Sequence, residues 1–173
     1  MVSLLHAAAG AVFIKKQTYI LRCLCTREEY VMEKLAWNET LSVGIALIDE
    51  QHKTWIDRFN ALAAAIAEHG AQRQIAMTLG FLIDYTHFHF ATEEKLMTAH
   101  TYPGLAEHLQ KHQELRGTLA DLVRDFEEDG PTQILADAIN TFLGNWLIMH
   151  IQQVDEKFGA FVKEKGIVIT GQG

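Results

Sequence analysis

Histidine and acidic residues recur in this sequence at positions that a helix would place on one face. His89 is followed four residues later by Glu93, and His108 is followed at the same distance by His112. Residues four apart on an α-helix differ by about 40° around its axis, so each pair shares a face. Imidazole and carboxylate groups arranged in this way can bind a metal ion or form a hydrogen-bonded polar core. His87, about 200° from His89, should point outward or into a groove.

The pairs belong to four predicted helices, because apolar residues recur at intervals of three and four from about residue 48 to residue 158. The predicted inward faces comprise Ile48, His52, Trp55, Ile56, Phe59, Leu62 and Ile66; Ile75, Leu79, Leu82, Thr86, His89, Phe90, Glu93 and Met97; Leu105, His108, Leu109, His112, Leu115, Leu119, Leu122 and Phe126; and Leu135, Ile139, Phe142, Leu143, Trp146, Leu147, His150, Val154 and Phe158. Thr132, after Gly130-Pro131, is the expected cap of the fourth helix. Short connections predict an all-α fold, an up-down-up-down antiparallel four-helix bundle.

Every predicted helix contributes imidazole to the same interior. His52 lies on the inward face of the first helix, and His150 on that of the fourth, with Asp155 five residues later. A buried carboxylate is unfavourable without a partner, so five histidines and two acids in one core require a compensating cation. We therefore favour a metal centre over a purely structural polar core.

The types of ligand indicate which metal this is. Structural zinc takes four ligands, often thiolates, and calcium and magnesium prefer oxygen, whereas this set consists mostly of nitrogen donors. Imidazole with carboxylate suits iron. Seven groups fit two metal ions that share two bridging carboxylates and a small exogenous bridge.

The spacing of His150 and Asp155 does not suit a regular helix, in which five residues correspond to about 140°. Either the two side chains approach the metals from two sides of a helix that lies close over the centre, or a π-type bulge brings them together. We expect the first arrangement. A backbone hydrogen bond from residue i to residue i−5 would decide for the second.

The composition suits a single globular domain and shows no basic surface for nucleic acid or anionic lipid, since the net charge is −7. The apolar N-terminal stretch is too short to span a membrane and does not have the order of a secretion signal. Cys23 and Cys25 are weak evidence for a metal site. We expect residues 1–31 to be a loosely ordered extension, or Met32 to be the natural start, with the bundle over 32–170 and the protein in the cytoplasm.

Four stretches together resemble the hemerythrin family in its single-domain bacterial form: WNETLSVGIALIDEQHK (37–53), HFATEEKLM (89–97), YPGLAEHLQKHQEL (102–115) and WLIMHIQQVD (146–155). The resemblance implies a di-iron centre in the core of the bundle, bridged by Glu93, Asp155 and an oxo or hydroxo group. It implies that His108, His112 and His150 bind one iron ion and that His52 and His89 bind the other. Trp146 and Leu147 match residues of the family's O2 pocket, although ordinary core packing explains them equally well.

The family's function would be reversible O2 binding for oxygen transport, delivery or storage, without catalysis. The alternatives are an O2 sensor that acts through a partner protein, and a di-iron enzyme that acts on O2, peroxide or nitric oxide. Ferritin-like oxidases use Glu-x-x-His pairs, which the predicted inward faces lack, so carriage is favoured. The expected partners are O2 and an O2-consuming enzyme that receives it, and we expect a monomer. We also expect the third and fourth helices to extend well beyond the ligands, which would place the centre toward one end.

Overall fold

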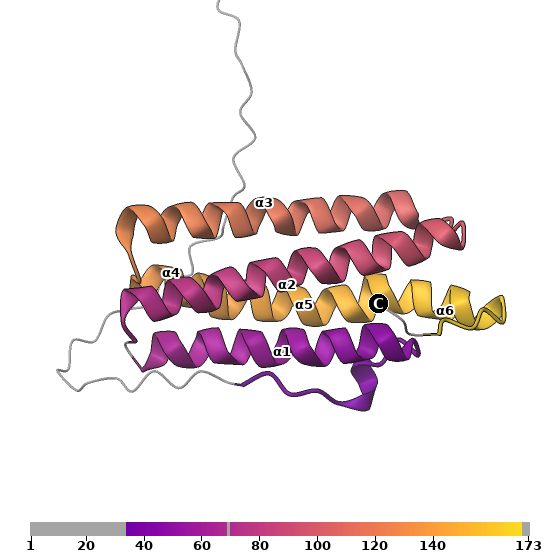
Figure 1. Ribbon diagram of the computed structural model, residues 1–173, viewed down its shortest axis with the longest axis horizontal. Coiled ribbons are helices and arrows are strands. Elements are labelled where there is room, and N and C mark those ends of the chain that lie inside the picture. Colours follow the sequence, from indigo (N-terminus) through magenta and orange to yellow (C-terminus); the bar gives the residue numbers. More distant parts are fainter. Residues whose placement is uncertain (1–33, 69, 171–173) are drawn as a thin grey trace, which may run out of the picture.

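The computed structural model describes residues 34–68 and 70–170 of the chain. Four long helical segments lie side by side in alternating directions (Figure 1), and none of the described residues forms a strand. The segments are α1 (Ala46–Ala67), α2 (Gln72–Ala99), α3 (Leu105–Asp129) and a fourth composed of α4 (Gln133–Ala138), η2 (Ile139–Leu143), α5 (Gly144–His150), η3 (Ile151–Asp155) and α6 (Glu156–Glu164). The predicted up-down-up-down bundle is confirmed.

The ends of the helices follow local signals in the sequence. The α3 helix ends before Gly130, whose φ of 72° lies in the left-handed region that glycine adopts without strain. Thr132 then caps the fourth segment, since its Oγ1 accepts a hydrogen bond of 3.2 Å from the Leu135 N–H. The expected cap is therefore present.

The residues before α1 are attached to its first turn. They include the short 3₁₀ helix η1 (Glu39–Leu41). The Ser42 hydroxyl and the Val43 N–H donate to the two carboxylate oxygens of Asp49, at 2.7 and 2.8 Å. The proposed extension over 1–31 and the alternative start at Met32 lie outside the described residues, so the domain division stays a prediction.

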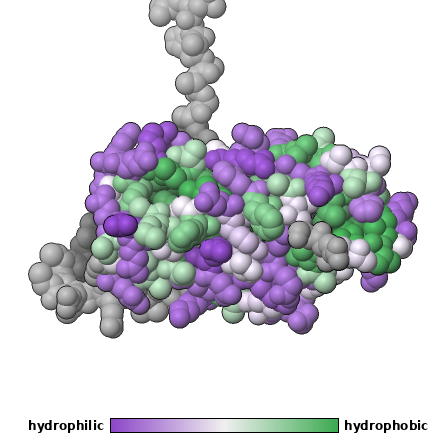
Figure 2. Space-filling view, viewed as in Figure 1, coloured by the Kyte–Doolittle hydropathy of each residue, from purple (hydrophilic) through white to green (hydrophobic). Residues whose placement is uncertain are grey.

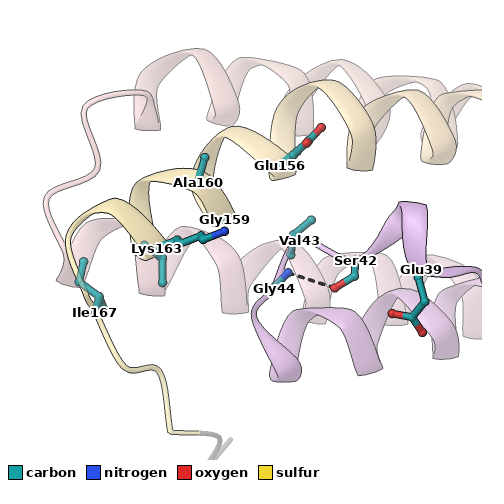
Figure 3. A pocket seen from close by; sticks show the side chains of 10 residues that line it. Glu39, Ser42, Val43, Gly44, Glu156, Gly159, Ala160, Lys163 and Ile167 are labelled. Atoms are coloured by element: carbon teal, nitrogen blue, oxygen red, sulfur yellow. Dashed lines mark hydrogen bonds between the residues drawn. The ribbon is translucent and has the colours of Figure 1, made fainter.

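The attached segment also packs against α6 at a glycine. Val43 and Gly159 lie near each other at the edge of a surface pocket (Figure 3). A Cβ atom added to Gly159 would be 2.0 Å from the carbonyl oxygen of Val43. This approach between two backbones therefore depends on the absence of a side chain at residue 159.

The predicted inward faces are buried or partly buried, except at two residues. Leu109 is 38% exposed and Phe142 is 44% exposed, so their predicted burial is wrong. Leu109 follows the buried His108 and is therefore turned about 100° away from it around the helix. Phe142 lies in η2, a π turn, where a wider turn changes the direction of side chains relative to an α-helix.

The outer surface carries some exposed apolar residues. Figure 2 shows hydrophobic residues in separate patches among hydrophilic ones on the face turned to the viewer. Met77, Phe81 and Phe88 of α2 are each about half exposed. Within the described part of the chain, no helix combines the length and the apolar character needed to cross a membrane.

Candidate metal centre

The structure brings all seven predicted ligands together in the interior. They are His52 of α1, His89 and Glu93 of α2, His108 and His112 of α3, His150 of α5 and Asp155 of η3. None of them is more than 4% exposed. The ligands lie near the start of α1 and α3 and near the end of the other two segments, which is the right-hand end of the bundle in Figure 1. As expected, the third and fourth segments continue well beyond the centre.

Five side chains each direct one donor atom to a common point, with these atoms within 4.8 Å of one another: Glu93, His108, His112, His150 and Asp155. The Nε2 atoms of His108 and His112 lie 3.3 and 3.2 Å from Oε2 of Glu93. The Nε2 atom of His150 lies 3.1 Å from Oδ1 of Asp155. A cation at this point could be bound by three imidazoles and two carboxylates.

A second cluster of four donors adjoins the first and consists of His52, His89, Glu93 and Asp155. The Nε2 atom of His52 is 3.3 Å from Oδ2 of Asp155, and that of His89 is 3.7 Å from Oε2 of Glu93. Both carboxylates belong to both clusters, so they are placed between two potential cation positions. The second position has one protein donor fewer than the first.

A π turn brings Asp155 to the centre. The Glu156 N–H donates to the carbonyl oxygen of Ile151, five residues earlier, at the end of η3. This turn contains one residue more than an α turn, so His150 and Asp155 point to the same place although five residues separate them. Our expectation that the two approach the metals from two sides of a regular helix lying close over the centre is therefore wrong, and the π-type bulge is correct.

Burial keeps three histidines of the centre neutral. It lowers the pKa of His108 to about 4. Burial, with a neighbouring histidine, also holds the pKa values of His89 and His112 well below their usual range. Neutral imidazole is the form that binds metals, so at pH 7 these three side chains are ready to act as ligands.

The two carboxylates have opposite tendencies. Burial, followed by the negative charges of Asp155 and Glu94, raises the pKa of Glu93 well above its usual value. Burial would also raise the pKa of Asp155, but His150 and His52 outweigh it and hold that pKa well below its usual range. Without a cation, Glu93 would therefore tend to keep a proton that a bound metal would displace.

Several buried polar atoms at the centre have no hydrogen-bond partner among the described residues. They are both ring nitrogens of His52, Nε2 of His89, Oε1 of Glu93, Nδ1 of His108, Nε2 of His150 and both carboxylate oxygens of Asp155. An unsatisfied buried polar group costs about 1–3 kcal/mol. Most of these atoms belong to the two donor clusters, and imidazole with carboxylate suits iron. The residues therefore fit two metal ions.

Neighbouring side chains hold two of the histidines from outside, and the sequence did not reveal them. Oε1 of Gln51 lies 3.0 Å from Nδ1 of His89. Oε1 of Glu94 lies 2.8 Å from Nδ1 of His112. Both partners are adjacent in sequence to a ligand, but the histidines they contact are on other helices, so only the packing of the helices pairs them.

Aromatic rings cover one side of the centre. The Phe90 ring stacks on that of His112, with centroids 3.5 Å apart, and the Trp146 ring stacks on that of His150 at 4.2 Å. Leu147 is buried in the core, as predicted. Trp146 thus lies beside the centre, while a specific role for it and for Leu147 in an O2 pocket stays a prediction.

Comparisons with known proteins agree with this geometry. The family model of the hemerythrin HHE cation binding domain matches residues 43–162, which include all seven predicted ligands. The chain belongs to the hemerythrin family. The bacteriohemerythrin of Stenotrophomonas maltophilia is 32% identical over 133 residues, which cover 76% of this chain and 84% of that protein. For the bacteriohemerythrin of Methylococcus capsulatus, the identity is 33% over 129 residues, or 74% and 96% of the two chains.

More distant members and solved structures give the same result. The myohemerythrin of Riftia pachyptila is 30% identical over 122 residues, covering 70% of this chain and 88% of that protein. A crystal structure of wild-type hemerythrin matches with a TM-score of 0.67 and 33% identity, over 73% of this chain and 95% of the other. Membership places this hemerythrin among the proteins that bind O2 at a non-heme di-iron centre.

Proposed function

We propose that this hemerythrin binds O2 reversibly at two iron ions and serves oxygen transport, delivery or storage. The observation that carries the proposal is the pair of donor clusters that share Glu93 and Asp155. When bound, ferrous iron supplies the electrons that reversible O2 binding needs. The protein supplies neutral imidazoles, two anionic bridges and an interior that excludes water.

The two clusters support an assignment of the ligands. His108, His112 and His150 would hold one iron ion, and His52 and His89 the other. Glu93 and Asp155, with an oxo or hydroxo group, would bridge them. Because the second cluster has four protein donors against five, an iron ion held there would have a coordination position free for O2.

The aromatic wall would protect the reduced centre. Phe90 is 1% exposed and packs on His112, and Trp146 packs on His150. Leu147 follows Trp146 in the sequence and is 2% exposed. Such a wall would keep water and protons away from the site. Water and protons would otherwise promote irreversible oxidation of the iron.

The donor composition favours carriage over catalysis. Five imidazoles and two carboxylates form the clusters, whereas ferritin-like oxidases use Glu-x-x-His pairs and a larger share of carboxylate. An O2-consuming enzyme is the natural recipient of the bound O2. We propose that the protein acts as a monomer, as we infer for single-domain members of the family.

Anaerobic reduction of the iron-loaded protein, followed by cycles of O2 and argon, tests the proposal. We expect two iron ions per chain and a visible absorption band that appears with O2 and fades when argon removes it. Rapid conversion to an oxidised form that no longer responds to O2 would contradict carriage and indicate an enzyme.

Variants test the ligands. His112→Ala or Glu93→Ala should lose iron, since each removes a donor from the five-membered cluster. His87→Ala is the matched control, because His87 is exposed on the same helix as Glu93 and is not part of either cluster. Full iron content in both ligand variants would refute the assignment.

A further inference from the structure

Glu94 connects a buried ligand to a cation at the surface. Its neighbour Glu93 points into the centre, whereas Glu94 is 24% exposed. Oε1 of Glu94 lies 2.8 Å from Nδ1 of His112 and accepts a hydrogen bond of 2.9 Å from Nη2 of Arg116. One carboxylate therefore contacts both a predicted iron ligand and a guanidinium group.

This contact determines which nitrogen of His112 carries the proton. A carboxylate accepts hydrogen bonds, so Nδ1 of His112 must be the donor. Nε2 then keeps its lone pair and points to the donor cluster, 3.2 Å from Oε2 of Glu93. The parallel Phe90 ring, 3.5 Å away, fixes the plane of the imidazole. The tautomer and the orientation of His112 are thus both those of a metal ligand.

Arg116 in turn fixes Glu94. Its guanidinium group is paired with Glu94 and lies over the Phe90 ring, 5.2 Å from the centroid. Phe90 therefore contacts both Arg116 and His112, so the four side chains form a closed arrangement between α2 and α3. Arg116 and Glu94 are each about three-quarters buried, and their contact is less weakened by solvent than one between fully exposed residues.

Beside the second cluster, the uncharged Gln51 contacts His89 as Glu94 contacts His112. Nδ1 of His89 lies 3.0 Å from Oε1 of Gln51, whose amide Nε2 donates to Oγ1 of Thr92 at 3.3 Å. An amide oxygen selects the same tautomer but brings no charge. A carboxylate attracts the Nδ1 proton more strongly and makes the imidazole a stronger electron donor to a metal.

We propose that Glu94, held by Arg116, is a positioning residue that makes His112 a stronger donor than His89 and so stabilises ferric iron selectively in the three-histidine cluster. This rests on the proposed di-iron function. The charge of Glu94 would lower the reduction potential of the iron ion that His112 binds. Gln51 would leave the potential at the two-histidine, O2-binding position less affected.

The test compares Glu94→Gln and Glu94→Ala with wild type. The glutamine keeps an oxygen that can accept from His112 but removes the charge, whereas alanine removes both. Glu114→Gln is the matched control, because Glu114 lies on α3, pairs with Lys111 at the surface and is absent from both clusters. The measurements are iron affinity by chelator competition and reduction potential by spectroelectrochemical titration, each with a thermal melt.

We expect Glu94→Ala to weaken iron binding 10- to 100-fold, the usual effect of losing a partner of a metal ligand. Glu94→Gln should favour ferrous over ferric iron at least tenfold, a rise of about 59 mV for a one-electron couple. Glu114→Gln should change neither value. If Glu94→Ala does not fold, the potential of Glu94→Gln decides.

The proposal is overturned if Glu94→Gln binds two iron ions at the wild-type potential, even with a lower melting temperature, since a purely structural role would produce that result. In that case the di-iron function stands. If wild type and the Glu114→Gln control themselves fail to bind two iron ions, the proposed function fails as well. The two failures are therefore distinguishable.

Discussion

Replacing Gly159 by alanine should destabilise this hemerythrin, whereas the same replacement at Gly117 should stabilise it. Both glycines are helical, Gly159 in α6 and Gly117 in α3. A Cβ atom at Gly159 would lie 2.0 Å from the Val43 carbonyl oxygen, while one at Gly117 would meet no atom within 4 Å beyond its chain neighbours and the backbone of its own helix. Val43 cannot move freely, since its N–H and the Ser42 hydroxyl are bonded to Asp49.

The two effects have different sizes as well as signs. Relief of the clash needs a backbone shift on the order of 1 Å, and such overpacking typically costs about 1–3 kcal/mol. Without a clash, alanine is favoured over glycine in a helix by about 0.5–1 kcal/mol. In a chain of 173 residues, each kcal/mol changes the melting temperature by roughly 2–4 °C. Gly159→Ala should therefore melt about 2–12 °C lower, and Gly117→Ala about 1–4 °C higher.

Thermal unfolding followed by circular dichroism measures both shifts, and urea unfolding of the metal-free proteins separates them from changes in iron content. A Gly159→Ala variant at least as stable as wild type would refute the close packing of α6 on the segment before α1. If Gly117→Ala were destabilised by a similar amount, the cause would be a general sensitivity to alanine and not the clash.

Three further predictions follow from the core, the helix cap and the pKa values. Phe142→Ser should change the free energy of unfolding by less than about 0.5 kcal/mol, whereas Leu143→Ala, at the fully buried neighbouring residue, should lower it by about 2–5 kcal/mol. If urea unfolding showed the same loss for both variants, the side-chain directions given by the π turn η2 would be contradicted. Thr132→Ala should cost about 1 kcal/mol through the lost cap, and Thr132→Ser should restore most of it, as urea midpoints would show. The metal-free protein should lose stability as the pH falls from 6.5 toward 4, because the unfolded chain protonates His108 at its usual pKa while burial lowers the pKa of the folded form to about 4. A urea midpoint that stays constant between pH 7 and pH 4.5 would contradict the lowered pKa of His108 in the folded protein.

The helices and the ligand types could be predicted from the sequence because both are local properties. Apolar residues at intervals of three and four define one face of a helix, and the four-residue spacing of His89 and Glu93 places both on it. Four such faces must bury their apolar area against one another, so their polar members meet in one core. The histidines and Glu93 of the candidate centre therefore followed from spacing, before any contact between helices was known, whereas the spacing of Asp155 did not place it on the same face.

The π turns were decided by the tertiary structure. A π turn is locally unfavourable relative to an α turn, so nothing in the residues from Ile151 to Asp155 predicts it by itself. Packing and the demands of the centre outweigh the local preference there, and Asp155 reaches His52 and His150 as a result. The exposure of Phe142 in η2 has the same origin.

By itself, the sequence determined an all-α bundle, its seven interior polar side chains and the kind of metal that suits them, because residue type and helical period act within one segment. Only the tertiary structure decided that Asp155 lies within reach of His52, and that Glu94 contacts His112 while Gln51 contacts His89. These are contacts between helices, and they depend on the rotation and offset at which complete helices pack.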